Sequence, residues 1–428
     1  MTTTLRNYIN GQWVEPLTGE YQPDINPATG EVVAMVARSG EEDAKKAIAA
    51  ARQAFSSWRK VPAPLRGEKL FRVGEMLRHQ KEELAYAMAQ EMGKSLVEAR
   101  GDVQEGIDMA FYMAGEGRRS FGMTTPSELA DKFAMAVRDP IGVAAIITPW
   151  NFPLAIPTWK IFPAVVLGNT VVFKPASETP HLAAQLIQIM DAAEFPPGVI
   201  NLVFGSGSTV GETLLTDPDV DVISFTGSNE TGRHVATVAG QGLKRVSLEL
   251  GGKNAIIVMD DANLDVAVDG IIWSAFGTSG QRCTAASRLI VQEGIYETLQ
   301  DRLTARMRQL KAGAGTDPAT EVGPLINQQA LEKVRQYIQI GREEGAQVAL
   351  GGSPAAGYGL DRGYFFEPTL FIDVTPQMRI AQEEIFGPVL SMIKVKSLEE
   401  AIAVNNQVTY GLSSSIFTEN VNAAFQAI

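Results

Sequence analysis

The sequence predicts an α/β protein with a large, doubly wound domain of the Rossmann type and a second α/β domain after it. From residue 142 onward, short apolar runs alternate with helical segments, and the alternation resumes after residue 254. Such runs are typical of a parallel sheet that helices cover on both faces. The 428 residues, 45% of them hydrophobic, suffice for about three domains with a sizeable core.

The chain is acidic, and this excludes several classes of partner. Its 37 Lys and Arg against 49 Asp and Glu give a net charge of −12, so we expect neither nucleic acid nor an anionic membrane as a partner. One Cys and three His leave few zinc ligands, and we predict no metal site. With no internal disulfide and no apolar signal segment, we expect a cytoplasmic protein. The most apolar stretch, 153–173, is interrupted by Pro157, Pro163 and Gly168, so we expect no membrane segment.

Helices open the chain. Apolar residues at three-to-four spacing predict helices over 41–60, 64–92 and 102–117. Residues 120–140 lack this period and predict an exposed hairpin.

The two α/β regions follow in order. In the first, we expect strands at 143–148, 170–173, 199–204, 222–225 and 245–250, with helices at 154–167, 180–193, 208–216 and 229–239 between them. In the second, we expect strands at 254–258, 288–292, 347–350, 370–373, 389–394 and 414–418, and helices at 263–277, 295–311, 327–344, 397–406 and 420–428. The last helix has no capping residues at its end.

A glycine-rich turn follows the third strand of the first region. Gly205-Ser-Gly-Ser-Thr-Val-Gly211 opens a helix, where main-chain N–H groups can approach a phosphate. The spacing is one residue longer than the dinucleotide fingerprint, so an ordinary tight turn is the alternative interpretation.

Three residues have the chemistry of a catalytic site. Cys283 lies in a polar loop beside Arg282, which favours a thiolate, although a lone Cys is more often a small buried hydrophobe. Glu249 ends the fifth strand before two glycines, where a base is well placed, or it pairs with Lys253. Asn151 lies in a loop stiffened by prolines and can donate to an oxyanion, or the loop is only a rigid turn.

Together these segments resemble the aldehyde dehydrogenase family. Five motifs occur in that family's order: Pro149-Trp-Asn-Phe-Pro153, Phe225-Thr-Gly-Ser228, Glu249-Leu-Gly-Gly-Lys253, Gly280-Gln-Arg-Cys283 and Glu383-Glu-Ile-Phe-Gly-Pro388. The resemblance extends from Tyr8 to Leu412. It implies a Rossmann-type cofactor domain in 1–119 and 141–253, an oligomerisation hairpin in 120–140 and an α/β catalytic domain in 254–428.

The resemblance implies a covalent mechanism for oxidising an aldehyde to a carboxylic acid. Cys283 would attack the aldehyde and form a thiohemiacetal, whose oxyanion the Asn151 amide and the Cys283 N–H would stabilise. Oxidation would leave a thioester, and Glu249 would activate the water that hydrolyses it. Lys160 resembles the lysine that helps to position the Asn and the cofactor.

The cofactor implied is NADP or NAD. Lys174 and Ser177 match residues that contact the adenosine ribose, and Ser228 matches a residue that contacts the pyrophosphate. Glu384 matches the residue that binds the nicotinamide ribose, and Phe386 matches a residue that packs near the nicotinamide. The remaining implied contacts are Thr148, Pro149, Trp150, Gly205, Phe225, Gly227, Leu250 and Gly251. Family members strict for NAD often carry Glu where Ser177 stands, so we expect NADP to be accepted at least as well as NAD.

The substrate implied is an ω-oxo carboxylate. Arg282-Cys283-Thr284 and Pro157-Thr-Trp-Lys160 resemble the branch that acts on α-ketoglutaric semialdehyde, also called 2,5-dioxopentanoate. Arg282 would anchor the distal carboxylate, with Thr284 beside it, unless Arg282 only shapes its loop. Trp159 stands where succinate-semialdehyde enzymes often carry Arg. A plain aliphatic or aromatic aldehyde is the alternative substrate.

Three other functions compete with this one. A CoA-acylating dehydrogenase would typically lack Glu249. A cysteine hydrolase would need a His near Cys283, and the nearest along the chain is His234. A catalytically silent binding protein would not need Asn151, Glu249 and Cys283 together. Because family chains continue for several tens of residues beyond this end, we also expect a truncated chain that forms a homodimer or homotetramer when full length.

Overall fold

The computed structural model describes residues 3–357 and 359–428, which form two compact units. The first contains the chain up to Ile25, Val32–Glu91 and Ala99–Glu249, and the second contains Asn26–Glu31, Met92–Glu98 and Leu250–Ile428. Two short segments of the N-terminal half therefore belong to the second unit, and the hairpin belongs to the first. No helix of the described ranges has both the length and the apolar character that crossing a membrane requires.

A seven-stranded sheet forms the centre of the first unit. Its strand order is β12 (Arg245–Glu249), β11 (Val222–Thr226), β8 (Val143–Ile147), β9 (Thr170–Lys174), β10 (Ile200–Leu202), β2 (Asn7–Ile9) and β3 (Gln12–Val14). The five predicted strands are all parallel, which confirms the doubly wound pattern. β8 and β9 are buried along their whole length, as their continuous apolar runs require.

The N-terminal strands were not predicted. β2 and β3 pair antiparallel to extend the sheet beyond β10. A separate small sheet joins β1 (Thr3–Leu5), β5 (Val32–Ala37) and β4 (Tyr21–Ile25). Most of these strands are too short for a period-two pattern to emerge from the sequence.

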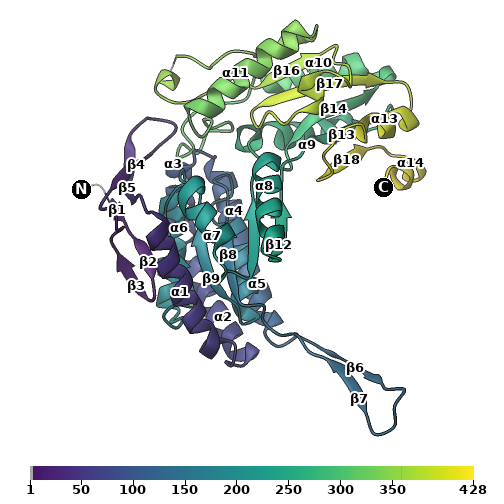
Figure 1. Ribbon diagram of the computed structural model, residues 1–428. Coiled ribbons are helices and arrows are strands. Elements are labelled where there is room, and N and C mark those ends of the chain that lie inside the picture. The colour runs from purple at the N-terminus through teal and green to yellow at the C-terminus, as the bar shows by residue number, and fades with distance from the viewer. Residues whose placement is uncertain (1–2, 358) are drawn as a thin grey trace. The chain divides into compact units, whose positions relative to one another are not determined.

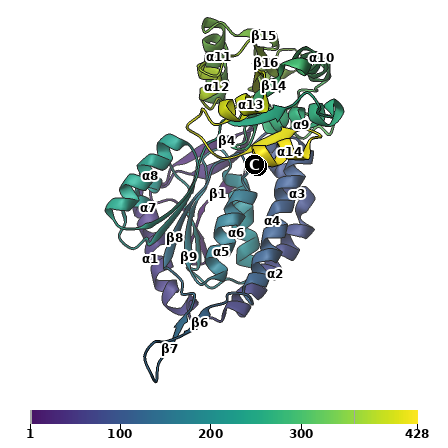
Figure 2. The ribbon, with the colours of Figure 1, turned by 90° about the vertical axis from the view of Figure 1, so that its right-hand side faces the viewer.

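Helices cover both faces of the seven-stranded sheet. Figure 2 shows α1, α7 and α8 on one face and α5 and α6 on the other. The helices are α1 (Glu41–Trp58), α2 (Ala63–His79), α3 (Lys81–Glu91), α4 (Leu96–Glu116), α5 (Ala155–Val166), α6 (Pro180–Ala192), α7 (Glu212–Thr216) and α8 (Asn229–Gln241). The prediction of one helix over 64–92 was wrong. Gln80 leaves helical geometry at φ −95° and ψ 12°, so α2 ends there and α3 begins.

The expected hairpin is present. β6 (Met123–Pro126) and β7 (Phe133–Ala136) pair antiparallel and are exposed along both strands. Figure 1 shows this hairpin projecting from the first unit. Its apolar side chains face solvent, Phe133 with 76% and Met135 with 62% of its surface exposed.

A six-stranded sheet forms the second unit. Its order is β15 (Gln347–Leu350), β16 (Thr369–Ile372), β17 (Val389–Val395), β14 (Ala286–Gln292), β13 (Asn254–Val258) and β18 (Ser414–Phe417). Only β15 runs antiparallel to its neighbour among these six. Its helices are α9 (Leu264–Phe276), α10 (Tyr296–Met307), α11 (Gln328–Glu343), α12 (Arg379–Gln382), α13 (Leu398–Asn405) and α14 (Val421–Ala427). The short α12 was not predicted.

Candidate active site

The parallel strands of the first unit end at one edge of the sheet, and several predicted site residues gather there. Glu249, the last residue of β12, pairs in register with the last residue of β11. The Gly227 N–H donates to the Glu249 carbonyl at 3.0 Å, and the Thr148 N–H donates to the Lys174 carbonyl at 3.3 Å. Because ligands of open α/β sheets bind beyond this edge, the arrangement fits a nucleotide.

Ser228 begins helix α8 at the same edge. Its Oγ accepts a hydrogen bond from the Thr231 N–H at 3.3 Å and so caps the helix. The opening N–H groups of this helix form the kind of site that attracts a phosphate. The pyrophosphate contact that the family resemblance implies for Ser228 stays a prediction.

The glycine-rich turn is tightly packed at Gly205. Gly205 has φ +151°, and a Cβ there would lie 2.5 Å from Val210 Cγ2 and 3.0 Å from the Ser39 carbonyl oxygen. The residue must be Gly because the main chain packs tightly at this point. A π-helical turn, Gly207–Gly211, follows it.

Lys160 and Glu249 interact electrostatically within the first unit. The Lys160 Nζ on α5 donates to Ser224 Oγ on β11 at 3.0 Å. Burial lowers the Lys160 pKa to about 8, while the Glu249 carboxylate acts to raise it. Glu249 itself is exposed, so water can reach its carboxylate.

The predicted adenosine-ribose residues lie at the end of β9, which is Lys174, and in the segment that follows it. Lys174 is buried, and its Nζ donates to the carbonyls of Pro175 at 2.8 Å and Gly205 at 3.3 Å. Burial lowers the Lys174 pKa to about 8 although the Glu178 carboxylate raises it. Ser177, three residues further along the chain, is exposed. Asn151, in the loop after β8, is buried with 2% of its surface exposed.

In the second unit, a strained turn precedes Cys283. Thr278 and Ser279 have φ of 50° and 55°, in the left-handed region that L-residues seldom occupy. Hydrogen bonds hold both side chains: Thr278 Oγ1 donates to Glu98 Oε1 at 2.9 Å, and Ser279 Oγ donates to the Gly323 carbonyl at 2.7 Å. Such strain persists only where the surroundings fix it, and it is common at functional sites. Cys283 is half-buried.

Asn254 fixes the loop that carries Cys283. Its Nδ2 donates to the Cys283 carbonyl at 2.7 Å and to the Ala285 carbonyl at 3.0 Å, and its Oδ1 accepts from the Ser413 N–H at 3.1 Å. A register shift between β13 and β14 lies at this residue. Sequence analysis missed Asn254, whose only signal was its position directly after the Glu249–Lys253 motif.

Glu384 lies against the glycines that follow β12. Its Oε1 accepts a hydrogen bond from the Gly252 N–H at 3.1 Å. A Cβ on Gly251 would lie 2.3 Å from Glu384 Oε2, so no larger residue fits there. Burial raises the Glu384 pKa, which the ammonium groups of Lys333 and Lys253 lower. A pocket in the second unit is lined by Gly252, Gly280, Arg282, Glu384 and Phe386 among others. Thus the predicted nicotinamide-side residues Gly251, Glu384 and Phe386 come together.

Arg282 is held by the end of helix α9. Its guanidinium donates to the carbonyls of Trp273 and Ser274, the latter at 3.1 Å, and lies 5.3 Å from the Trp273 ring centroid. Burial lowers the Arg282 pKa. Its Nε is buried with no hydrogen-bond partner among the described residues. Thr284 is exposed on the other side of Cys283.

The remaining ligand-type side chains form no second candidate centre. Within the described ranges, no three His, Cys, Asp or Glu side chains are grouped as metal ligands. The three His residues all belong to the first unit, whereas Cys283 belongs to the second.

Comparisons with known proteins agree with this geometry. The model of the family described as "Aldehyde dehydrogenase family" matches residues 13–428. The α-ketoglutaric semialdehyde dehydrogenase of Bacillus subtilis is 43% identical over 419 residues, which cover 98% of this chain and 86% of that protein. The 2,5-dioxopentanoate dehydrogenase of Saccharolobus solfataricus is 39% identical over 415 residues, with 96% and 86% covered.

A solved structure of a relative has the same fold. The betaine aldehyde dehydrogenase of Staphylococcus aureus in complex with NAD+ superposes with a TM-score of 0.97 at 37% identity, over 99% of this chain and 84% of that one.

Proposed function

Because this chain belongs to the aldehyde dehydrogenase family, we propose that it oxidises an ω-oxo carboxylate semialdehyde to the dicarboxylic acid with NAD(P)+. The observation that carries the proposal is the placement of Cys283 on a loop held by Asn254, in the unit where Glu384 packs against Gly251. Relatives named for α-ketoglutaric semialdehyde and 2,5-dioxopentanoate support the substrate class.

The Cys283 sulfur is the nucleophile. Its thiolate adds to the aldehyde carbon, and the oxygen that becomes negative is stabilised by the Asn151 amide and the Cys283 N–H. The turn before the sulfur and the Asn254 amide behind it restrict the loop, so the sulfur needs little rearrangement to attack.

Glu249 acts as general base in the second half of the reaction. Its carboxylate is exposed and takes a proton from the water that attacks the Cys283 thioester, which releases the acid and the free thiol. Lys160 acts electrostatically on this carboxylate and is anchored to Ser224, so it steadies the charge at the strand edge.

The residues present fit a nicotinamide dinucleotide. The N-terminus of α8 at Ser228 suits the pyrophosphate. Because Gly251 has no side chain, the Glu384 carboxylate lies directly against its main chain. Thr148, Pro149, Trp150, Phe225, Gly227, Leu250 and Phe386 complete the proposed contacts. When bound, the oxidised nicotinamide is the electron acceptor of the reaction.

We assign NADP as accepted at least as well as NAD. The exposed Ser177 hydroxyl can donate to a 2′-phosphate, and the Lys174 ammonium lies in the same short segment. A Glu at position 177 would repel that phosphate.

Arg282 and Thr284 are the proposed substrate residues. Arg282 is partly exposed and directly precedes Cys283, so its guanidinium is a candidate donor to the distal carboxylate, and Thr284, the residue after Cys283, is exposed. The exposed apolar hairpin further supports assembly into a homodimer or homotetramer, since monomeric proteins seldom leave such side chains in water.

The test is an NAD(P)H absorbance assay over semialdehydes, plain aliphatic aldehydes and aromatic aldehydes with each cofactor. We expect the highest kcat/KM with an ω-oxo carboxylate and no turnover in Cys283→Ala, which should still bind the cofactor. Retention of a tenth of wild-type turnover, a barrier change of only ~1.4 kcal/mol, would remove Cys283 as the nucleophile. Equal kcat/KM values for all aldehydes would contradict the assignment of an ω-oxo carboxylate as the substrate.

A further inference from the structure

Three consecutive residues of the loop before Cys283 have a left-handed backbone. Thr278, Ser279 and Gly280 have φ of 50°, 55° and 70°. Glycine adopts such angles freely, whereas a β-branched residue such as Thr adopts them only where its surroundings hold it. The contacts of Thr278 therefore determine whether the turn, and with it the Cys283 sulfur, keeps its position.

The carboxylate of Glu98 holds Thr278. Its Oε1 accepts from the Thr278 hydroxyl at 2.9 Å, and its Oε2 accepts from the Ser95 hydroxyl at 2.9 Å. The Ser279 hydroxyl, by comparison, donates to the neutral Gly323 carbonyl. Because a hydrogen bond to an ionised acceptor is about twice as strong as one between neutral groups, Glu98 is the stronger of these two supports.

Glu98 belongs to a segment that is itself fixed in the second unit. This segment, Met92–Glu98, is part of that unit although it lies in the N-terminal half of the chain. The Leu96 N–H donates to the Gly315 carbonyl at 3.1 Å, and a Cβ on Gly315 would lie 2.1 Å from the Lys94 carbonyl oxygen. The two main chains are thus in direct contact, which gives the Glu98 side chain a rigid base.

The same carboxylate approaches the guanidinium next to the sulfur. A Cβ on Gly277 would lie 2.9 Å from Glu98 Oε1 and 2.6 Å from Arg282 Nη2, so both groups border the space that the glycine leaves open. Burial lowers the Arg282 pKa, while the charges of Glu98 and of the Cys283 thiolate raise it. The guanidinium therefore interacts with both negative charges.

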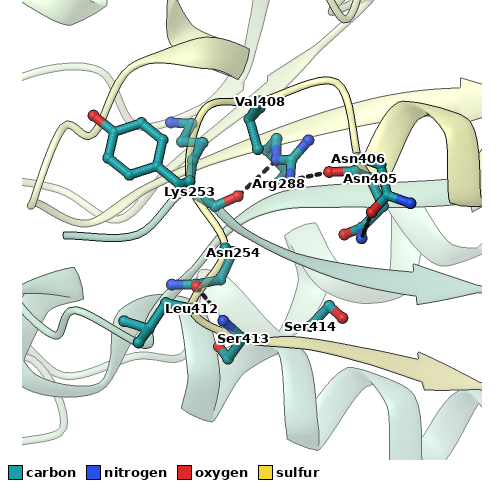
Figure 3. Close-up of a pocket in the computed structure, with 11 residues that line it drawn as sticks. Lys253, Asn254, Arg288, Asn405, Asn406, Val408, Leu412, Ser413 and Ser414 are labelled. Atoms are coloured by element: carbon teal, nitrogen blue, oxygen red, sulfur yellow. Dashed lines mark hydrogen bonds between the residues drawn. The ribbon is translucent and has the colours of Figure 1, made fainter. Parts of the chain in front are cut away.

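Asn254 holds the other end of the loop without a charge. Its Nδ2 donates to the Cys283 carbonyl at 2.7 Å, and its Oδ1 accepts from the Ser413 N–H at 3.1 Å, a bond that Figure 3 shows. An amide at this place positions the loop only. A carboxylate at position 98 also changes the electrostatic potential at the sulfur.

We propose that Glu98 is a positioning residue for the reaction: it holds the turn before Cys283 through Thr278, and its charge balances the Arg282 guanidinium. Because Cys283 is taken as the nucleophile, this role rests on the proposed function. The balance sets how strongly the site favours an anionic reactant over a neutral one, since Glu98 repels the negative charge that Arg282 attracts.

Alkylation of the thiol measures both effects in the full chain. Cys283 is its one cysteine, so labelling followed by intact mass reports on this sulfur alone. Iodoacetamide is neutral and iodoacetate is anionic, and both react with the thiolate. The ratio of their rate constants cancels the thiolate fraction and reports the charge around the sulfur. Because alkylation needs neither aldehyde nor cofactor, a failure of the proposed function is separate from a failure here.

Glu98→Gln tests the charge. The variant keeps an oxygen that accepts from Thr278 but leaves the guanidinium unbalanced. We expect the rate constant for iodoacetate, divided by that for iodoacetamide, to rise at least about threefold. Glu297→Gln is the matched control, since it removes an exposed carboxylate of the same unit that pairs with Lys394 at 3.1 Å, and it should keep the wild-type ratio.

Thr278→Val tests the turn, because it removes the hydrogen bond and keeps the charge. We expect both rate constants to fall at least about tenfold without a rise in their ratio, since the sulfur moves away from the groups that favour its thiolate. Thr278→Ser keeps the hydroxyl and should lie closer to the wild type than Thr278→Val does.

An unchanged ratio in Glu98→Gln, or unchanged rate constants in Thr278→Val, would overturn the proposal. If Thr278→Val does not fold, Glu98→Gln still decides, because it preserves the size of a half-buried side chain.

Discussion

The side-chain amide of Asn254 donates a hydrogen bond to the Cys283 carbonyl at 2.7 Å. The same amide reaches the Ala285 carbonyl and the Ser413 N–H, so one buried side chain joins the nucleophile's loop to the segment that leads into β18. Three hydrogen bonds from one side chain restrict the loop more than sequence-local contacts can. The sulfur's position thus depends on a residue outside its own loop.

Replacing Asn254 with Ala should reduce the reactivity of Cys283. Loss of both donated bonds lets the loop shift, and misplacement of a reacting group by about 1 Å can lower the rate about 100-fold. We expect kcat to fall at least about tenfold with KM nearly unchanged, and iodoacetamide to alkylate Cys283 more slowly. Asn327→Ala, which removes a helix cap, should lower stability without changing the alkylation rate. Equal alkylation rates in the wild type and Asn254→Ala would argue against a positioning role.

Replacing Glu249 with Gln should slow hydrolysis of the thioester more than its formation. The amide preserves the shape of the side chain but cannot accept a proton at neutral pH. Stopped-flow absorbance should show a burst of NAD(P)H followed by slow turnover. Glu343→Gln, at an exposed position on α11, is the matched control and should behave as the wild type. Disappearance of the burst itself would show that Glu249 acts earlier, in activating Cys283.

Replacing Ser177 with Glu should shift the enzyme toward NAD. The new carboxylate would lie where the 2′-phosphate of NADP is expected, and like charges at short range repel. We expect kcat/KM for NADP to fall at least about tenfold more than that for NAD. Glu178→Gln should act in the opposite direction, since it removes a neighbouring negative charge. A wild-type enzyme with a much higher kcat/KM for NAD than for NADP would contradict the cofactor proposal.

Stability should depend on pH through two buried carboxyl groups of the first unit, Asp24 and Glu91. Burial raises the Asp24 pKa from 3.8 to about 7, and burial together with the Asp24 charge raises that of Glu91. A pKa raised by folding means that the folded state holds its proton more tightly. The Asp24 contribution to the free energy of unfolding should therefore fall as pH rises from about 4 to about 7 and level off above that, and the Glu91 contribution should change in the same direction.

The measurement is the thermal midpoint of Asp24→Asn between pH 4 and pH 8. Asn stays neutral throughout, so this variant should gain stability relative to the wild type at pH 8 and lose that advantage near pH 4. Asp301→Asn, at an exposed position on α10, should show no such trend. A difference between Asp24→Asn and the wild type that does not vary with pH would show that Asp24 titrates normally.

Charged substitutions on the hairpin should disrupt assembly. Phe133 and Met135 are largely exposed apolar side chains on one strand, and burial between copies is the arrangement that removes them from water. We expect Phe133→Asp and Met135→Asp to lower the mass measured by light scattering, while Lys132→Asp, directly before that strand, leaves it unchanged. A monomeric wild type at micromolar concentration, or variants that keep the wild-type mass, would refute assembly through the hairpin.

The sequence by itself determined the fold class, the five parallel strands of the first unit and most of the second sheet, because each buried strand is a continuous apolar run. It also determined the family, because five short motifs in a fixed order are a specific signal. The break at Gln80 and the three-residue strands were not predicted, since neither alters the local period of apolar residues.

Only the tertiary structure decided how distant segments complete the site. Asn254 and Ser413 are 159 residues apart, and Thr278 and Glu98 are 180 apart, yet both pairs are hydrogen-bonded around the loop of Cys283. The sequence likewise does not indicate that the Lys253 ammonium is buried without a hydrogen-bond partner among the described residues, while the Lys253 carbonyl accepts from Arg288. Local sequence patterns indicate which face of a helix or strand is buried. The hydrogen-bond partners of a side chain and its desolvation depend instead on which elements the chain topology brings together. That arrangement is a property of the folded chain alone.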